Sequence, residues 1–281
     1  MDSAVFTAVV AAAALHAGWN AFVKIGASPL VSLAMISMFS GMVGAIAIPW
    51  LGLPDARALP WLALSVFFHT GYRWFLARAY TWGDLGQVYP LARGTAPLLV
   101  ALIGIWVLDE TLHPLTLLGI AILSAGIMVM AFRGGRPAVH LGAHAVLFAL
   151  STSAFIAAYT VVDGLGGRAS ASPHIYAAWL LFLDGIAIFL VLLAARVPEL
   201  ATSLKRFWKP AFFGGLMSAA AYWIAIWAMT KAPIALVAAV RESSILFAAL
   251  ISVFILREPL SVWRSVAATL ILLGLIVMRL A

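Results

Sequence analysis

Leu108-Asp109-Glu110-Thr111-Leu112 is a charged interruption between two long apolar runs, and the chain returns to this pattern 148 residues later as Leu256-Arg257-Glu258-Pro259-Leu260. The same shift aligns Arg93 with Arg241 and Gly126 with Gly274, and the weak similarity covers whole halves of the chain. The sequence therefore predicts two related repeats, residues 1–132 and 141–281, joined by a linker at 133–140.

Apolar runs of membrane-spanning length lie on both sides of each motif. About 20 mostly apolar residues are needed to cross a bilayer as a helix. The runs are 4–24, 30–50, 60–80, 85–108, 114–132, 141–162, 175–195, 210–230, 234–256 and 261–280. Turn residues separate them, such as Gly-Leu-Pro-Asp at 52–55 and Gly-Leu-Gly-Gly at 164–167. Alternating strand patterns are absent, so we predict an all-α integral membrane protein of about ten helices rather than a β-barrel.

The number of spans in each repeat sets their relative direction. Five is odd, so the second repeat must enter the bilayer from the opposite side to the first. Two inverted five-helix repeats are a common construction of secondary transporters, whose substrate site lies between the repeats near the midplane.

Composition excludes several classes of protein. The 281 residues are 65% hydrophobic and 10% charged, whereas soluble domains are about 45–50% apolar and about 25% charged. The net charge of +7 is expected to reside in loops and does not indicate nucleic-acid binding. Cysteine is absent, and no hydrolase, phosphate-loop or metal-ligand motif occurs, so we expect no enzymatic activity, metal or cofactor. Met1-Asp2-Ser3 lacks the basic residues of a cleaved signal peptide, so the first run is expected to remain.

Arg93 is the first of several ionisable residues inside the spans, where a charge is costly and usually faces a cavity or a partner. It lies between Pro90 and Pro97, which predicts a kink or break that exposes backbone groups beside a wet cavity. Its guanidinium would grip an anion bidentately, and Arg93→Ala is expected to abolish transport and leave folding intact. The alternative is a structural arginine bound to helix-end carbonyls.

Arg241 and Glu242 interrupt the ninth run. Neighbouring helical residues point about 100° apart, so only one of them can line a given cavity. Arg241 is a second anion-binding candidate. Glu242 would neutralise an arginine when substrate is absent, or carry a proton. The alternative is a buried ion pair that only fixes packing.

Polar and aromatic residues in other spans complete the candidate site. His16, Asn20 and Lys24 share one helix face, as do His69 and Arg73. The predicted substrate-binding residues are Arg93, Arg241, His16, Asn20, Tyr72, Trp74 and Tyr222. The predicted coupling or gating residues are Glu242, His69 and Asp184, since imidazole titrates near neutral pH and a carboxylate can exchange a proton. Interhelical hydrogen bonds and interface-belt aromatics are the alternatives. For Glu110 and Glu258 we predict a structural role at helix N-termini.

The chain resembles the EamA family of the drug/metabolite transporter superfamily. The resemblance rests on the two five-helix repeats, on Leu-x-Glu after the fourth and ninth helices, and on the fifth-helix run at 118–127. It implies a cavity lined by helices 1, 3, 4, 6, 8 and 9, alternating access by rocking of helices 3–4 and 8–9, and cytoplasmic termini. It also implies peripheral helices 5 and 10, which form a homodimer contact in smaller relatives. The stretch from Leu15 to Lys24 resembles a subgroup associated with phosphonate utilisation.

The leading interpretation is a secondary transporter in the inner membrane for a small anion-bearing metabolite: an amino acid, organic acid or phosphonate. Coupling would come from protons or from exchange. A lipid-carrier flippase would also need a lateral opening for acyl chains. A non-transporting receptor or assembly protein would have a sealed core with Arg93 and Glu242 locked together.

The charge count disagrees with the termini that the resemblance implies. If the N-terminus were inside, few cations would lie near the inner ends of the spans: Arg57, Arg168, Lys231 and Arg279. More would lie outside: Lys24, Arg78, Arg133, Arg136, Arg196, Lys205, Arg206, Lys209 and Arg257. The positive-inside rule therefore favours termini outside.

Overall fold

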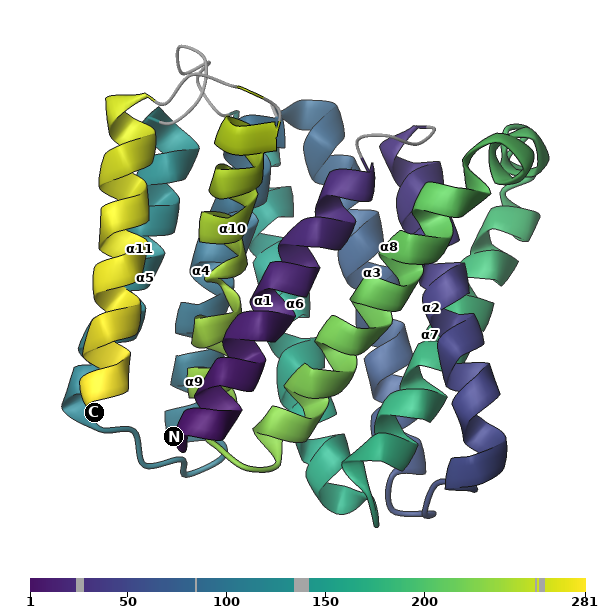
Figure 1. Ribbon diagram of the computed structural model, residues 1–281, viewed down its shortest axis with the longest axis horizontal. Helices are drawn as coiled ribbons and strands as arrows, with labels where there is room; N and C mark the ends of the chain where they lie inside the picture. The colour runs from purple at the N-terminus through teal and green to yellow at the C-terminus, as the bar shows by residue number, and fades with distance from the viewer. Residues whose placement is uncertain (24–27, 84, 134–141, 256, 258–260) are drawn as a thin grey trace.

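A computed structural model describes residues 1–23, 28–83, 85–133, 142–255, 257 and 261–281, and every regular element among them is helical. The helices run back and forth along one bundle, with both termini at the same end (Figure 1). They are α1 Ser3–Val23, α2 Pro29–Leu51, α3 Leu59–Trp82, α4 Leu85–Trp106, α5 Pro114–Arg133, α6 Ala143–Ala169, α7 Pro173–Ala194, α8 Leu200–Met229, α9 Ile234–Arg241, α10 Ser244–Leu250, the π-helical turn η1 Ile251–Ile255 and α11 Val262–Leu280.

The lengths and apolar composition of these helices are those of a multi-pass membrane protein. Within the described residues, seven are long and apolar enough to span a bilayer, counting Ile234–Phe254 as one, and Pro90–Trp106 and Pro114–Met130 are shorter apolar helices. The remaining helix, α3, carries His69, Arg73 and Arg78 and is correspondingly less apolar. Each predicted run matches one helix or, for the ninth run, the series α9, α10 and η1.

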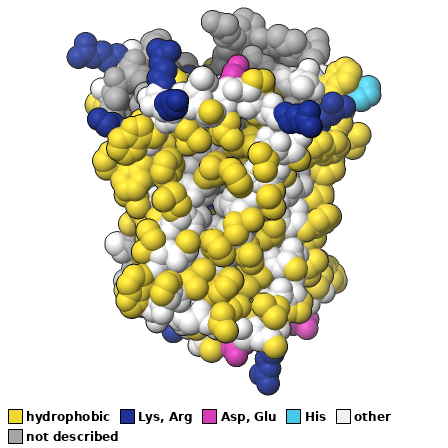
Figure 2. Space-filling view, turned by 90° about the vertical axis from the view of Figure 1, so that its right-hand side faces the viewer, with side chains coloured by type: hydrophobic (Ala, Val, Ile, Leu, Met, Phe, Trp, Pro, Cys, Tyr) yellow, Lys and Arg dark blue, Asp and Glu magenta, His cyan; other side chains and the backbone are white. Residues whose placement is uncertain are grey.

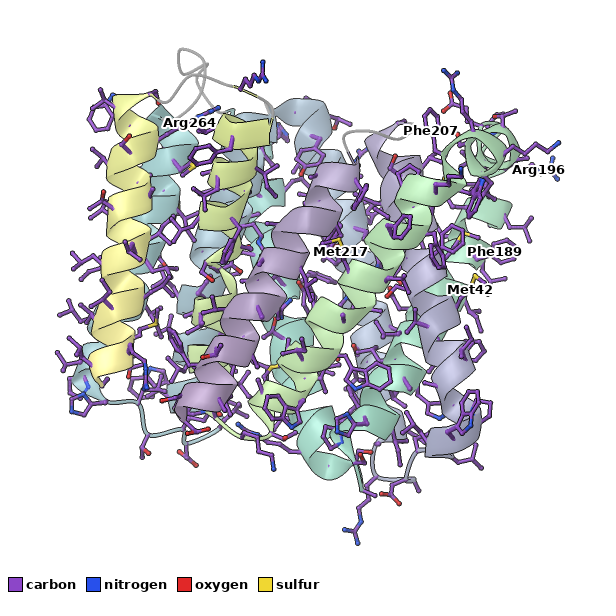
Figure 3. The ribbon with its side chains drawn as sticks, in the orientation of Figure 1. Met42, Phe189, Arg196, Phe207, Met217 and Arg264 are labelled. Atoms are coloured by element: carbon purple, nitrogen blue, oxygen red, sulfur yellow. The ribbon has the colours of Figure 1, made fainter. Side chains whose placement is uncertain are left out.

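The outer surface is also that of a protein embedded in a membrane. Large apolar side chains such as Met42 and Phe189 project outward, where they are 54% and 41% exposed (Figure 3). Figure 2 shows an apolar band between two polar edges, with Lys and Arg gathered along the upper edge. We name this upper edge, which carries Arg78, Arg196, Lys205, Arg206, Lys209, Arg257 and Arg264, the basic end. The opposite edge, which holds both termini, is the terminal end.

Two predicted boundaries are wrong. The glycines at 164–167 do not end a span, because α6 continues to Ala169. Side chains from other helices occupy the space beside these glycines, Ile234 beside Gly164 and Tyr176 beside Gly166, so the glycines allow close packing inside the helix. The eighth helix begins at Leu200, ten residues earlier than predicted, and leaves helical geometry at Phe207 (φ −119°, ψ 19°). Its first turns are seen end-on in Figure 1 and lie across the bundle axis.

The predicted break at Arg93 is absent, because α4 is continuous through Pro90 and Pro97. Each proline leaves a carbonyl one turn earlier without its amide donor. These carbonyls are those of Gly86 and Arg93. Hydroxyl groups donate to two other carbonyls of α4: Thr95 to Leu91 (2.8 Å), and Ser153 of α6 to Ala92 (2.7 Å). The interrupted span is instead the ninth, where Glu242 and Ser243 separate α9 from α10.

The two halves of the chain interleave. The extensive helix contacts are those of α1 with α8, α3 with α6, α2 with α7 and α5 with α11, and each joins residues 1–132 to residues 141–281. Glycines bring backbones together at two of these contacts. Gly41 of α2 faces Gly185 of α7, and Gly119 of α5 faces Gly274 of α11. Small residues at such contacts let membrane helices approach closely.

Candidate functional site

A cavity of about 90 Å³ lies between the helices. Its polar and aromatic lining comes from seven helices and comprises His16, Trp19, Ser37, Ser40, His69, Tyr72, Arg73, Tyr159, Asp184, Ser218, Tyr222 and Arg241. A space of this size holds several water molecules or a small solute. The site therefore combines a polar chamber with side chains that carry both signs of charge.

Six of the ten predicted site residues line this cavity: His16, His69, Tyr72, Asp184, Tyr222 and Arg241. Arg93 and Glu242 line a smaller neighbouring cavity of about 10 Å³, to which Tyr159 and Arg241 also contribute. Arg241 thus borders both spaces. Two other residues singled out in the sequence, Lys24 and Glu258, lie outside the described residues.

Two predicted pocket residues, Trp74 and Asn20, do not line the cavity. Trp74 is wrong as a pocket residue, because it is 55% exposed on the outer surface of α3, where it packs against Phe75 and Arg78. It lies only two residues from Tyr72, and on a helix this spacing points a side chain to the other face. The Asn20 amide donates to the His16 carbonyl (2.7 Å), and Asn20 is not among the cavity residues.

Among the arginines that line the two cavities, Arg241 is the one that makes no ion pair with a described carboxylate. Its guanidinium lies over the ring of Tyr222, 5.1 Å from the centroid. Within the described part of the chain it makes no ion pair. The buried Nε2 of His16, in the same cavity, also has no hydrogen-bond partner there. This side of the chamber therefore offers a positive charge and an unsatisfied ring nitrogen to whatever occupies it.

Arg93 is held by Glu242, with 3.0 Å between Nη2 and Oε1. Both residues are buried, Arg93 being 7% and Glu242 5% exposed. The second carboxylate oxygen of Glu242 is buried without a hydrogen-bond partner among the described residues. A receptor or assembly protein with a sealed core would have this ion pair, and here two cavities adjoin it.

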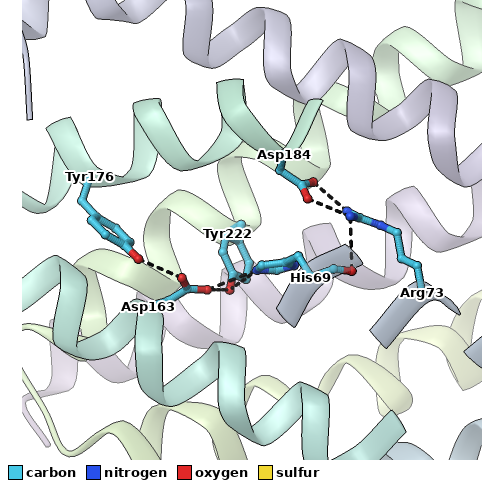
Figure 4. A network of polar contacts seen from close by, with 6 residues as sticks. All are labelled: His69, Arg73, Asp163, Tyr176, Asp184 and Tyr222. Carbon is cyan, nitrogen blue, oxygen red and sulfur yellow. Dashed lines mark hydrogen bonds and ion pairs between the residues drawn. The ribbon is translucent and has the colours of Figure 1, made fainter. Parts of the chain in front are cut away.

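A second cluster surrounds Asp163 of α6, which is fully buried. Nε2 of His69 lies 3.2 Å from Oδ2 of Asp163 and 3.2 Å from the Tyr222 hydroxyl. The Tyr222 hydroxyl donates to Oδ2, and the Tyr176 hydroxyl donates to Oδ1 at 3.1 Å (Figure 4). The ring of His69 also stacks on Tyr159, with 4.1 Å between centroids. Four helices thus meet at one carboxylate.

Arg73 of α3 and Asp184 of α7 form a bidentate ion pair beside this cluster (Figure 4). The two N–O distances are 2.7 Å and 2.6 Å, and Nη2 also donates to Ser37 of α2 at 3.3 Å. Planar two-point pairing is the strongest geometry available to arginine and carboxylate. Asp184, predicted as a proton-exchange candidate, is therefore committed to a guanidinium.

Several residues of the site were missing from the predicted set. Asp163, Arg73, Tyr159, Tyr176 and Trp19 contribute to the cavity or to the cluster around it. A carboxylate inside an apolar span is expensive and therefore informative. That signal was lost for Asp163 because the sixth span was predicted to end at residue 162, one position before it.

Glu110 has a structural contact, as predicted, but at a different helix. Its Oε1 accepts from the backbone amide of Ile234 (3.0 Å) at the start of α9, and from Arg168 (2.9 Å). Arg168 also donates to the carbonyls of Met229 and Ala232, at 2.9 and 3.1 Å. The loop after α4 is thus fastened to the turn between α8 and α9, and a negative charge caps the helix that carries Arg241.

Comparisons with known proteins agree with this architecture. The family model described as the EamA-like transporter family matches residues 143–280. A solved structure described as "Crystal structure of protein" is 18% identical, with a TM-score of 0.79, and the match covers 100% of this chain and 98% of that chain. This likeness supports the fold. No curated protein matches the sequence.

Proposed function

Because the second half of the chain, residues 143–280, belongs to the EamA-like transporter family, we propose that the protein is a secondary transporter of a small anionic metabolite in the inner membrane. The observation that carries this proposal is Arg241, a cation on the wall of a polar cavity whose described surroundings give it no carboxylate. A cation inside a membrane protein is costly unless compensated. A carboxylate or phosphonate group would compensate it.

We further propose that residues 1–132 and 141–281 are inverted repeats related by a two-fold axis. Exchanging corresponding helices turns the contact of α1 with α8 into that of α6 with α3, and both occur. Shifting by 148 residues turns the approach of Gly119 to Gly274 into that of Gly126 to Ala267, and both occur. Asp109 and Arg257, which occupy equivalent places and differ in type, share left-handed φ values of 51° and 55°.

In alternating access, the change of conformation would then exchange the partners of the buried charges. Arg93 on α4 and Glu242 at the end of α9 connect two of the helices that the family resemblance expects to rock. In this conformation the Glu242 carboxylate is paired with the guanidinium of Arg93. An anion that entered beside Arg241 would compete for Arg93 and would release Glu242. Ion-pair exchange of this kind lets binding energy drive a change of conformation.

The flippase alternative is less well supported, because the apolar groove does not reach the polar cavity. The groove has a volume of about 680 Å³ and lies between α3 and α7, lined by Leu62, Trp179, Leu183 and others. It shares no lining residue with the polar cavity, which touches the other face of α7 at Leu180 and Asp184. A lipid carrier would need its headgroup and acyl chain in one continuous space.

The homodimer expectation also takes a different form in this chain. The resemblance implied a dimer contact through the fifth and tenth helices of smaller relatives. Here α5 and α11 pack against each other within one chain. We propose that this internal contact replaces that dimer contact.

The transport proposal is tested by reconstitution. We expect purified protein in proteoliposomes to take up at least one of three labelled solutes that carry an anionic group, L-alanine, L-lactate or methylphosphonate, with saturable kinetics. These probes represent the amino acid, organic acid and phosphonate classes. Empty liposomes are the control. If none of the three is moved in either direction and none raises the melting temperature, the transport proposal fails and a receptor or assembly role is favoured.

The orientation follows from the charge distribution, and we predict that the basic end faces the cytoplasm and both termini face outward. The natural chain has no cysteine, so a single introduced thiol reports its own side. Ala171 lies at the terminal end and Ala201 at the basic end, both exposed. A membrane-impermeant maleimide on intact cells should label Ala171→Cys and spare Ala201→Cys until the cells are opened. The reverse labelling would show cytoplasmic termini.

A further inference from the structure

We propose that His69 and Asp163 form the proton-binding site of this protein, and that one proton enters together with each monoanion bound at Arg241. The inference rests on the proposed transport function, and it names the coupling ion and the direction of coupling. It is carried by the way in which the buried charges are paired.

Of the three carboxylates Asp163, Asp184 and Glu242 around the cavities, two are committed to arginines. Asp184 makes a bidentate pair with Arg73, and Glu242 pairs with Arg93. A guanidinium stays protonated across the physiological range, so both of these carboxylates already have a permanent counter-charge. Asp163 differs, because its contacts are a histidine ring and two tyrosine hydroxyls. Histidine is the side chain whose charge changes near neutral pH.

The proton step is simple in atoms. Neutral His69 with its proton on Nε2 donates to Oδ2 of Asp163, 3.2 Å away. A second proton, carried into the cavity as hydronium, adds to the other ring nitrogen, Nδ1. The bond that breaks is an O–H bond of the hydronium, which is left as water. The resulting imidazolium is balanced by the Asp163 carboxylate and lies against the face of Tyr159, an arrangement that favours a cation. His69 lines the cavity, so the proton has a route from the water there.

Titratable and charged side chains from six helices surround the His69–Asp163 pair and set its electrostatic environment. They are His16 of α1, Tyr72 and Arg73 of α3, Tyr159 of α6, Tyr176 and Asp184 of α7, Tyr222 of α8 and Arg241 of α9. Arg93 and Glu242 lie in the adjoining small cavity. Apart from His69, the charged members are three guanidiniums and three carboxylates when Asp163 is included, and their charges sum to zero.

This balance predicts the coupling. Adding a monoanion alone gives the core one net negative charge, and adding a proton alone gives it one net positive charge. Either state leaves an uncompensated charge in a low-dielectric interior, which is strongly unfavourable. Binding both, or neither, keeps the core neutral. The two sites also share Tyr222, whose hydroxyl contacts Asp163 and His69 while its ring carries the guanidinium of Arg241.

The experiment separates driven accumulation from exchange in proteoliposomes, with L-lactate or methylphosphonate, whichever the wild type moves as a monoanion. L-alanine is a zwitterion near neutral pH and does not test the charge balance. In wild type, an acidic outside should drive accumulation, and a potassium–valinomycin potential should not. In Asp163→Asn the empty core already carries one positive charge. We expect it to keep at least half of the exchange rate, to lose more than 90% of the pH-driven accumulation and to become sensitive to membrane potential. Glu199→Gln, an exposed loop-end change, is the matched control.

A second measurement does not depend on transport. Infrared difference spectra of the protein in lipid, between about pH 5.5 and pH 8, should contain an imidazole protonation band that His69→Gln removes and Glu199→Gln retains. A wild type that moves no probe contradicts the transport function, while this band still reports the proton site. Two results would overturn the proton-site proposal. One is a His69→Gln spectrum that keeps the imidazole band, and the other is pH-driven accumulation by Asp163→Asn at the wild-type level.

Discussion

Replacing Arg241 by alanine is expected to lower kcat/KM for the transported anion by about 100-fold, which corresponds to about 2.7 kcal/mol of lost binding in the rate-limiting state. The reason is that Arg241 borders both cavities and has no carboxylate partner among the described residues. Its charge is therefore available to a ligand, while the charges of Arg73 and Arg93 are already used inside the protein.

The same substitution should have a small effect on stability. Removing Arg241 breaks no ion pair among the described residues, although it leaves the core with three carboxylates and two guanidiniums. It forfeits mainly the contact with the Tyr222 ring, which is worth about 1–2 kcal/mol. Arg241→Lys keeps the positive charge but loses the planar fork that binds carboxylates at two points. We expect this variant to recover part of the lost transport and to raise KM more than it lowers kcat.

Initial uptake rates over a range of substrate concentrations, measured in proteoliposomes of equal protein content, check this prediction. Arg78→Ala is the matched control, because Arg78 lies at the basic end against Trp74 and Phe148, away from both cavities. Wild-type kinetics in Arg241→Ala would remove this residue from the binding site.

Span positions and the inventory of buried polar residues could be predicted from the sequence, because both follow from the cost of placing polar groups in hydrocarbon. The partners of those residues could not. Arg73 and Asp184 are 111 positions apart, and His69 and Tyr222 are 153 apart. These contacts join α3 to α7 and α3 to α8, which are distant in the chain, and no local pattern specifies them.

Glycine and proline were also ambiguous in sequence. Gly-Leu-Gly-Gly at 164–167 predicted a turn, but it lies inside α6 because the missing side chains admit Ile234 and Tyr176. Pro90 and Pro97 predicted a break at Arg93, but side-chain hydroxyls donate to nearby carbonyls of α4. Both residue types are tolerated inside membrane helices, where neighbouring helices can fill the space beside a glycine or satisfy a freed backbone group.

Removing Arg93 alone is expected to destabilise the protein by about 3–5 kcal/mol, because the carboxyl group of Glu242 would be left buried without its partner. The sequence alone predicted that Arg93→Ala would abolish transport and leave folding intact. Because Arg93 is paired with Glu242, a different set of substitutions is needed to test its role. We therefore choose Arg93→Met and the double variant Arg93→Met/Glu242→Leu, in which apolar side chains of similar volume replace both charges.

The double variant should recover most of the stability that Arg93→Met loses, since a buried pair can often be exchanged for well-packed apolar side chains at little cost. Unfolding in mixed micelles with increasing SDS fraction measures both losses. The double variant should nevertheless show no transport, because the proposed mechanism needs Glu242 to leave Arg93 when the anion arrives. If the double variant transported at the wild-type rate, the pair would be a packing element alone, and the gate would have to lie elsewhere, with Arg73 and Asp184 the next pair to test.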